Sequence, residues 1–154
     1  MSAEPVVHAL ARAGLTVAVA ESLTGGALTA HLVEVPGASA VVRGGIVAYA
    51  TDLKAALLGV DSDLLAERGP VDPVVARQMA DGVRARLGSD IGVATTGVAG
   101  PSPQSGRGVG TVFIAVTTAE RASVRPLRLV GDRDRLRQAT VLVATALLRG
   151  TLLD

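Results

Sequence analysis

The sequence contains no cysteine and no tryptophan, and Tyr49 and Phe113 are its only aromatic residues. The lack of cysteine excludes disulfide scaffolds, thiol nucleophiles and thiolate metal sites. The scarcity of aromatic side chains removes the stacking platforms that bind single-stranded nucleic acids. Valine, leucine, isoleucine and alanine are therefore expected to form the core.

Net charge and long apolar runs are lacking as well. The sequence has 15 Lys and Arg residues and 14 Asp and Glu residues, so the formal net charge is +1. Without a positive field, nucleic acid is not an expected partner. No apolar run reaches the roughly 18 residues that cross a bilayer, and residues 1–7 (MSAEPVV) lack the pattern of a signal peptide. We expect a cytoplasmic protein with no membrane partner.

Lysine is nearly absent: Lys54 is the only one among the 15 basic residues, and the other 14 are arginines. An arginine cannot lose its proton inside a protein, whereas a desolvated lysine can, and it then serves as a general base. Lys54 is thus the only side-chain source of a neutral amine. The ordinary alternative is a solvated lysine on a helix.

The sequence does contain enough hydrophobic residues to form the core of one domain. The 154 residues are 49% hydrophobic and 19% charged, which predicts one folded domain over residues 1–154. Helix signals alternate with strand signals in the first half, and a strand pair follows, which predicts a three-layer α/β domain with a mixed sheet. The predicted helices span 5–14, the segment up to about 34, 52–58, 61–69 (helix or turn), 73–87 and 132–149, and the predicted strands span 15–20, 44–50, 91–96, 109–118 and 122–130.

Three loops that follow predicted strands are candidates for chemistry, because open α/β sheets bind ligands beyond their strand ends. The first, residues 20–26 (AESLTGG), places Ser22 near free N–H groups at a helix start. A simple helix cap is the alternative for Ser22. The second, residues 44–54, holds both Tyr49 and Lys54, and Thr51 or Asp52 is the expected cap of its helix.

The third loop, residues 95–103, contains Gly97 and Gly100, which allow a ligand to approach the backbone closely. A mobile connection is the alternative, above all for residues 102–108. Arg133 and Arg137 are four positions apart on one predicted helix, where they could clamp a phosphate or simply face solvent. His8 and His31 lack partners at a metal-binding spacing, so no metal site is expected.

Six motifs, in order, resemble the C-terminal domain of the CinA family. The resemblance covers nearly the whole chain. The motifs are AESLTGG (20–26), PGAS (36–39), GGIVAYATDLKAALLGV (44–60), TGVAGP (96–101), VGTV (109–112) and GDRDRLR (131–137).

Stand-alone versions of that domain are nicotinamide-nucleotide amidohydrolases, also called PncC. The resemblance implies an α/β/α fold with a mixed, mostly parallel five-stranded sheet and assembly into homo-oligomers. It implies hydrolysis of nicotinamide mononucleotide to nicotinate mononucleotide and ammonia in NAD recycling, with neither metal nor cofactor.

Carried onto this sequence, the resemblance implies that Ser22 is the nucleophile, Lys54 its general base and Tyr49 a proton relay or hydrogen-bond donor. N–H groups near Thr24, Gly25 and Gly26 would hold the oxyanion. The remaining substrate-binding candidates are Thr96, Gly97, Gly100, Arg133 and Arg137.

The sequence departs from the family at three places: Leu23 replaces a cysteine, Asp72 replaces a serine, and residues 102–108 (SPQSGRG) replace an acidic and glycine-rich loop. A carboxylate at position 72 would repel a nearby phosphate. These differences leave room for a catalytically silent nucleotide-binding or interaction module. A phosphate-binding transferase fits less well, because no complete P-loop is present.

Overall fold

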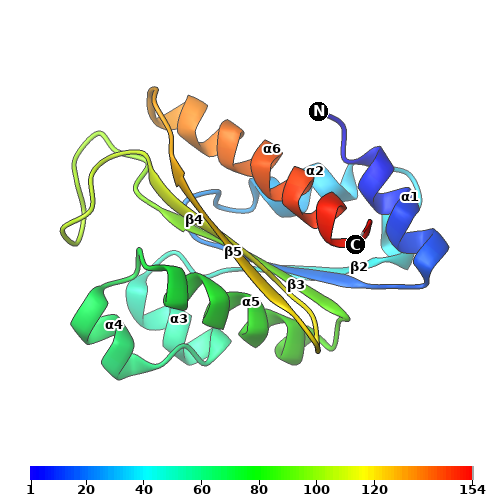
Figure 1. Cartoon of the computed structure of the whole chain (residues 1–154), viewed down its shortest axis with the longest axis horizontal. Helices are drawn as coiled ribbons and strands as arrows, with labels where there is room; N and C mark the ends of the chain where they lie inside the picture. Colours follow the sequence, from blue (N-terminus) through cyan, green and yellow to red (C-terminus); the bar gives the residue numbers. More distant parts are fainter. Residues whose placement is uncertain (154) are drawn as a thin grey trace.

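The computed structural model describes residues 1–153, which fold around one five-stranded sheet of order β2-β1-β3-β4-β5 (Figure 1). The strands are β1 (Val17–Glu21), β2 (Val42–Val47), β3 (Ile91–Gly97), β4 (Thr111–Thr117) and β5 (Ala122–Arg128). The helices are α1 (Glu4–Ala13), α2 (Ala27–Val33), α3 (Thr51–Leu58), α4 (Ser62–Arg68), α5 (Pro73–Leu87) and α6 (Arg133–Thr151), with a 3-10 turn η1 (Ala38–Ala40).

The sheet is mixed, as predicted, but it is not mostly parallel. Strand β1 pairs in parallel with β2 and β3, whereas β3 with β4 and β4 with β5 pair antiparallel. The short turn at residues 118–121 forces β5 to return alongside β4, because so short a connection joins only antiparallel strands. Two of the four pairings are therefore antiparallel.

Helices cover both faces of the sheet. In Figure 1, α1, α2 and α6 lie above it, and α3, α4 and α5 lie below it. The upper core is built mainly from valine, leucine and isoleucine, including Val19 and Ile114. The lower core uses smaller residues such as Ala20, Ala94 and Ala115. The central strands are thus buried on both sides, which explains their continuous apolar runs.

Helix α5 packs unusually close to the sheet because glycine faces it. A Cβ atom at Gly92 of β3 would lie 2.0 Å from the carbonyl oxygen of Ala80 in α5, far inside van der Waals contact. This close contact fixes the position of α5. Helix α5 in turn packs closely against the end of α3, because a Cβ atom at Gly82 would lie 1.8 Å from the Leu58 carbonyl oxygen. Through α5, the lower layer therefore fixes the position of α3, which carries Lys54, relative to the sheet.

Local caps account for some element boundaries and correct others. Asp72 caps α5 as predicted, accepting hydrogen bonds from the N–H groups of Val74 and Val75 at 2.8 and 3.3 Å. The expected cap of α3 by Thr51 or Asp52 is wrong: Ala50 holds the N-cap position without a side-chain bond, because Thr51 is already helical. Strand β2 ends at Val47, so the strand predicted to reach residue 50 leaves the sheet earlier.

Between Met1 and Leu153, every helix falls short of the length or apolar character that a bilayer crossing requires.

Candidate active site

The carboxyl ends of the three parallel strands β2, β1 and β3 meet at one edge of the sheet. Ser22 follows β1, and its N–H donates to the carbonyl of Thr95 in β3 at 3.0 Å. On the other side, the N–H of Ala48 donates to the carbonyl of Glu21 at 2.9 Å. The loops after β2 and β3 therefore flank Ser22, which is the usual place for a ligand site in an open α/β sheet.

Lys54 reaches into this edge from α3 and contacts Ser22. Its side chain is only 1% exposed, and its Nζ lies 3.0 Å from Ser22 Oγ. The Nζ also donates to the carbonyl oxygens of Ala48 at 2.7 Å and Tyr49 at 3.4 Å. No carboxylate among residues 1–153 forms an ion pair with it. Burial disfavours the charged form and lowers the pKa of Lys54 from its ordinary 10.5 to about 8.

This geometry suits a neutral amine. A neutral amine has two N–H groups and one lone pair, and the two carbonyls take the N–H groups. The charged form donates its third N–H to Ser22 Oγ at 3.0 Å, and in the neutral form the lone pair takes that direction, which is the arrangement in which the amine accepts the hydroxyl proton.

Glu21, beside the serine, is a functional position that the sequence reasoning missed. Its carboxylate is fully buried and accepts hydrogen bonds from Leu28 N–H at 2.8 Å, Thr29 N–H at 3.0 Å and Thr29 Oγ1 at 2.7 Å. The N–H groups of the first turn of α2 are therefore occupied, not free as expected. Ser22 does not cap this helix either, because Gly26 holds the N-cap position.

Gly45 makes room for this carboxylate cap. A Cβ atom there would lie 2.1 Å from Thr29 Oγ1, so any side chain at position 45 would displace the hydroxyl that Glu21 accepts. The glycine on β2 and the glutamate on β1 thus hold α2 in place, and with it the turn that presents Ser22.

We expect Glu21→Ala to lower the free energy of unfolding by about 3 kcal/mol, because it leaves buried N–H and hydroxyl donors without an acceptor. Glu21→Gln keeps one carbonyl acceptor and should cost roughly half as much. Urea titration measures both. Glu34→Ala, at an exposed glutamate after the same helix, is the matched control and should stay near wild type. Wild-type stability of Glu21→Ala would show that the cap contributes nothing.

A cavity of about 130 Å³ opens at this edge of the sheet. Ser22 and Lys54 both line it, so the hydroxyl and the amine face the same enclosed space. Its lining comprises residues 22–23, 49, 54, 70–71, 96–100, 102, 104 and 133. Leu23, the 70–71 segment and residues 102 and 104 were not among the predicted binding residues. Ser102 belongs to the third candidate loop, residues 95–103, whereas Gln104 lies beyond it in the segment for which a mobile connection is the alternative.

Arg133 spans two loops that line this cavity. Its guanidinium donates to the Tyr49 hydroxyl at 2.9 Å and to the Gly100 carbonyl at 2.6 Å. The Tyr49 ring is 60% exposed, and its hydroxyl makes no hydrogen bond to Ser22 or Lys54. Only the backbone carbonyl of Tyr49 contacts Lys54. The expected proton relay through the phenol is therefore absent from this geometry, which instead pairs the phenol with Arg133.

Arg137 does not join Arg133 in a phosphate clamp. Its guanidinium donates to the carbonyls of Leu23 at 2.9 Å and Thr24 at 3.2 Å, and it does not line the cavity. The long side chain instead braces the backbone that follows Ser22. The joint clamp that the helical spacing suggested is thus not formed.

The expected oxyanion donors near Thr24, Gly25 and Gly26 also lie outside the cavity lining. The Gly25 N–H donates to the Ser22 carbonyl at 3.1 Å, and the Thr24 hydroxyl is bonded to that of Thr95 at 2.8 Å. The N–H groups of Leu23, Thr24 and Gly26 have no backbone acceptor within residues 1–153, and of these three residues only Leu23 lines the cavity.

The end of β3, with Thr96 and Gly97, and the loop after it, with Gly100, line the cavity, as their predicted roles require. The Thr96 hydroxyl donates to the Pro70 carbonyl at 2.7 Å, which ties the start of α5 to this loop. Gly97 has no space for a side chain, since a Cβ would lie 2.8 Å from the Thr111 carbonyl oxygen. Gly100 has a φ of 85°, a conformation that favours glycine.

The described residues hold no group of three or more His, Cys, Asp or Glu side chains placed to bind a metal ion. Of the two histidines, His8 is exposed on α1 and His31 is half-buried on α2.

Comparisons with known proteins agree on one family. A family model described as CinA C-terminal domain matches residues 1–152. A CinA-like protein of Frankia casuarinae is 51% identical over 144 residues, which are 94% of this chain and 33% of that protein. The chain spans about a third of the length of the curated relatives it matches.

Solved structures match over nearly the full length of both chains. The competence/damage inducible protein CihA of Agrobacterium tumefaciens has a TM-score of 0.94 and 35% identity, covering 99% of this chain and 93% of that one. A CinA superfamily protein of Klebsiella pneumoniae has a TM-score of 0.94 and 30% identity, covering 98% and 95%.

Proposed function

Since the chain belongs to the CinA C-terminal domain family, we propose that it is an amidohydrolase that converts nicotinamide mononucleotide to nicotinate mononucleotide and ammonia. One observation carries the proposal. A buried lysine without an acidic partner lies 3.0 Å from a serine hydroxyl at the cavity. A lysine in that setting has little structural value, because its burial disfavours the charged form, whereas a serine–lysine pair is suited to acyl transfer.

The first half of the reaction forms an ester on Ser22. As its Oγ attacks the carboxamide carbon, the hydroxyl proton passes to Lys54 Nζ. The negative charge that develops on the amide oxygen faces the unpaired N–H of Leu23. The C–N bond then breaks, and Lys54 returns the proton to the departing nitrogen, which leaves as ammonia.

The second half regenerates the serine. A water molecule takes the place of ammonia, gives a proton to Lys54 and attacks the ester carbon. The C–O bond to Ser22 breaks, Lys54 protonates the serine oxygen, and the product acid releases its remaining proton to solvent and leaves as a carboxylate. The lysine starts and ends the cycle neutral, so a pKa of about 8 keeps a useful fraction of the base form near neutral pH.

The positive charge of the pyridinium ring supports this choice of substrate. A cation near Lys54 disfavours protonation of the amine and lowers its pKa further. The same charge withdraws electrons from the carboxamide and eases attack at its carbon. Beyond the ring, Arg133 at the cavity is the cation available to the phosphate.

The decisive experiment measures ammonia released from nicotinamide mononucleotide by the purified protein, with glutamine as a carboxamide that lacks the pyridinium. We expect release from the nucleotide and none above background from glutamine. Folded protein that binds the nucleotide tightly in calorimetry but releases no ammonia would reject the proposal and favour a silent nucleotide-binding module.

The pH dependence of the reaction follows from Lys54. Only the neutral amine accepts the serine proton, so kcat/KM should rise about tenfold per pH unit below 8 and level off above it. In the complex, the pyridinium lowers the pKa further, so the rise in kcat should be shifted to lower pH. Steady-state kinetics from pH 5.5 to 9.5, in buffers of about constant ionic strength, tests both. A profile that falls between pH 6 and 8 contradicts a lysine base.

A further inference from the structure

Residues 104–107 form a small hairpin at the cavity, called here the mouth hairpin. Gln104 N–H donates to the Arg107 carbonyl at 3.1 Å, and Arg107 N–H donates to the Gln104 carbonyl at 2.9 Å. Between them, Ser105 and Gly106 have φ values of 51° and 72°, as in the type I′ turns that close two-residue hairpins. Gln104 lines the cavity. This segment is therefore an organised part of the site.

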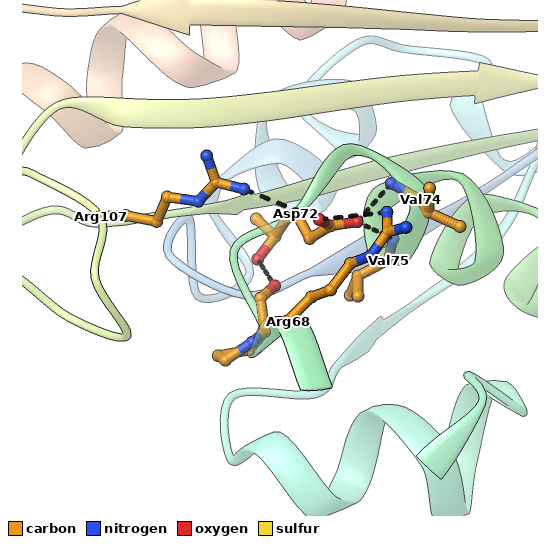
Figure 2. A network of polar contacts seen from close by, with 7 residues as sticks. Arg68, Asp72, Val74, Val75 and Arg107 are labelled. Atoms are coloured by element: carbon orange, nitrogen blue, oxygen red, sulfur yellow. Dashed lines mark hydrogen bonds and ion pairs between the residues drawn. The ribbon is translucent and has the colours of Figure 1, made fainter. Parts of the chain in front are cut away.

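Arg107 attaches the mouth hairpin to the body of the protein. One of its guanidinium nitrogens lies 3.7 Å from Asp72 Oδ2 (Figure 2). The guanidinium carbon lies 5.5 Å from the centre of the Phe113 ring. At the turn, Ser105 packs against Gly69, where an added Cβ would lie 2.9 Å from the Ser105 Cβ. Contacts to β4 and to the segment before α5 thus hold the turn and the Arg107 end of the hairpin.

Asp72 is a rigid anchor for this contact. It is 3% exposed, and its Oδ1 is held by the first N–H groups of α5, so the other oxygen, Oδ2, faces outward. Figure 2 shows the guanidinium groups of Arg68 and Arg107 approaching this carboxylate from two sides. These two cations balance the charge of Asp72, and the residue does not line the cavity. The phosphate repulsion expected from the sequence is therefore offset.

We propose that the Asp72–Arg107 ion pair fastens the mouth hairpin beside the cavity, and that Gln104, so positioned, hydrogen-bonds a sugar hydroxyl of the substrate. This inference rests on the proposed function. The cavity of about 130 Å³ is smaller than the roughly 300 Å³ of pockets that enclose a whole ligand. With the carboxamide at Ser22, the sugar must lie toward the mouth. A primary amide offers both a donor and an acceptor, which is the complement of a hydroxyl.

Arg107 and Asp72 act through Gln104 and are positioning residues. Gln104 itself is the contact that sets specificity. Experiment separates the two roles, because substitution of Arg107 or Asp72 changes the attachment of the hairpin, whereas substitution of Gln104 changes only a side chain.

Two variants test the attachment by hydrogen exchange at the amides of residues 104 and 107. Arg107→Ala removes the cation, and Asp72→Asn removes the charge but keeps the side-chain acceptor that caps α5. We expect exchange about fivefold faster in both, the size that a partly exposed ion pair supports. Arg68→Ala removes the other cation from the same carboxylate and should leave exchange unchanged. Unchanged exchange in both variants, or an equal change in all three, overturns the attachment.

Kinetics tests the sugar contact, using nicotinamide mononucleotide and 1-methylnicotinamide, which keeps the pyridinium carboxamide and lacks the sugar. Gln104→Ala and Arg107→Ala should each lower kcat/KM for the nucleotide about fivefold, mainly through KM, and leave 1-methylnicotinamide unaffected. Gln104→Ala should not change exchange in the hairpin backbone. Equal losses on both compounds overturn the sugar contact. If the wild type releases no ammonia, the proposed function fails, and dissociation constants for the same two compounds decide the contact instead.

Discussion

Ser22→Ala is expected to abolish turnover, with kcat lowered by about 10⁴-fold or more. The variant removes the atom that attacks the carboxamide, and among the described residues no other hydroxyl is hydrogen-bonded to Lys54 Nζ to replace it. Lys54 keeps its two carbonyl partners, so its place is unchanged. The measurement is ammonia release at saturating nicotinamide mononucleotide, in parallel with the dissociation constant of the product nucleotide.

Folding and binding should survive this substitution, which separates chemistry from structure. Ser22 is tied to the sheet through its backbone N–H, and its carbonyl accepts from Gly25, so loss of the hydroxyl leaves both bonds intact. We expect a melting temperature near that of the wild type and a product affinity within about threefold. Ser62→Ala, at an exposed serine of α4, controls for the loss of one hydroxyl. More than about 1% of wild-type kcat in Ser22→Ala would mean that water attacks directly.

Parts of this site could be predicted from sequence because they depend on local signals. Clear sequence patterns predict the strands at whose carboxyl ends Ser22, Tyr49 and Gly97 lie. Parallel strands bring these ends together. Lys54 could be predicted as the general base because no other side chain in the sequence can supply a neutral amine. The aspartate before Pro73 gave the start of α5, because an N-cap followed by proline is a strong local pattern.

The remainder depends on contacts that have no local signal. Glu21 accepts from residues seven and eight positions away, and its role exists only because Gly45 of another strand leaves room for Thr29. The 102–108 segment is rich in serine and glycine, which is typical of a mobile loop. Its order comes from Asp72, 35 positions before Arg107 in the sequence.

The arginines of α6 show a different limit. Helical periodicity correctly places positions 133 and 137 on one face, but it does not say where a long side chain ends. Arg133 lines the cavity even though it donates to the Gly100 carbonyl, whereas the carbonyls of Leu23 and Thr24 hold the guanidinium of Arg137 outside the cavity lining. Backbone acceptors near a helix compete with a ligand for the same cation. Only the three-dimensional position of those carbonyls decides which arginine is left for substrate.

Lys54→Arg is expected to be nearly as damaging as loss of the serine, with kcat/KM lowered by roughly 10²–10⁴-fold. The substitution keeps the positive charge, but a guanidinium does not give up its proton at any accessible pH and therefore cannot act as the base. It should also remove the rise in kcat/KM around pH 8, because the titrating amine is gone. The measurement is the full pH profile of the variant beside that of the wild type.

A second variant separates the loss of the base from a poor fit of the larger side chain. Lys54→Met has a similar length and no charge, so it removes the base without overfilling a site that is 1% exposed. If Lys54 is the base, both variants lose activity while their melting curves remain cooperative. If Lys54 only supplies positive charge to the oxyanion, the arginine variant stays active and the methionine variant does not. An active arginine variant would therefore assign the serine proton to another acceptor and remove the serine–lysine mechanism.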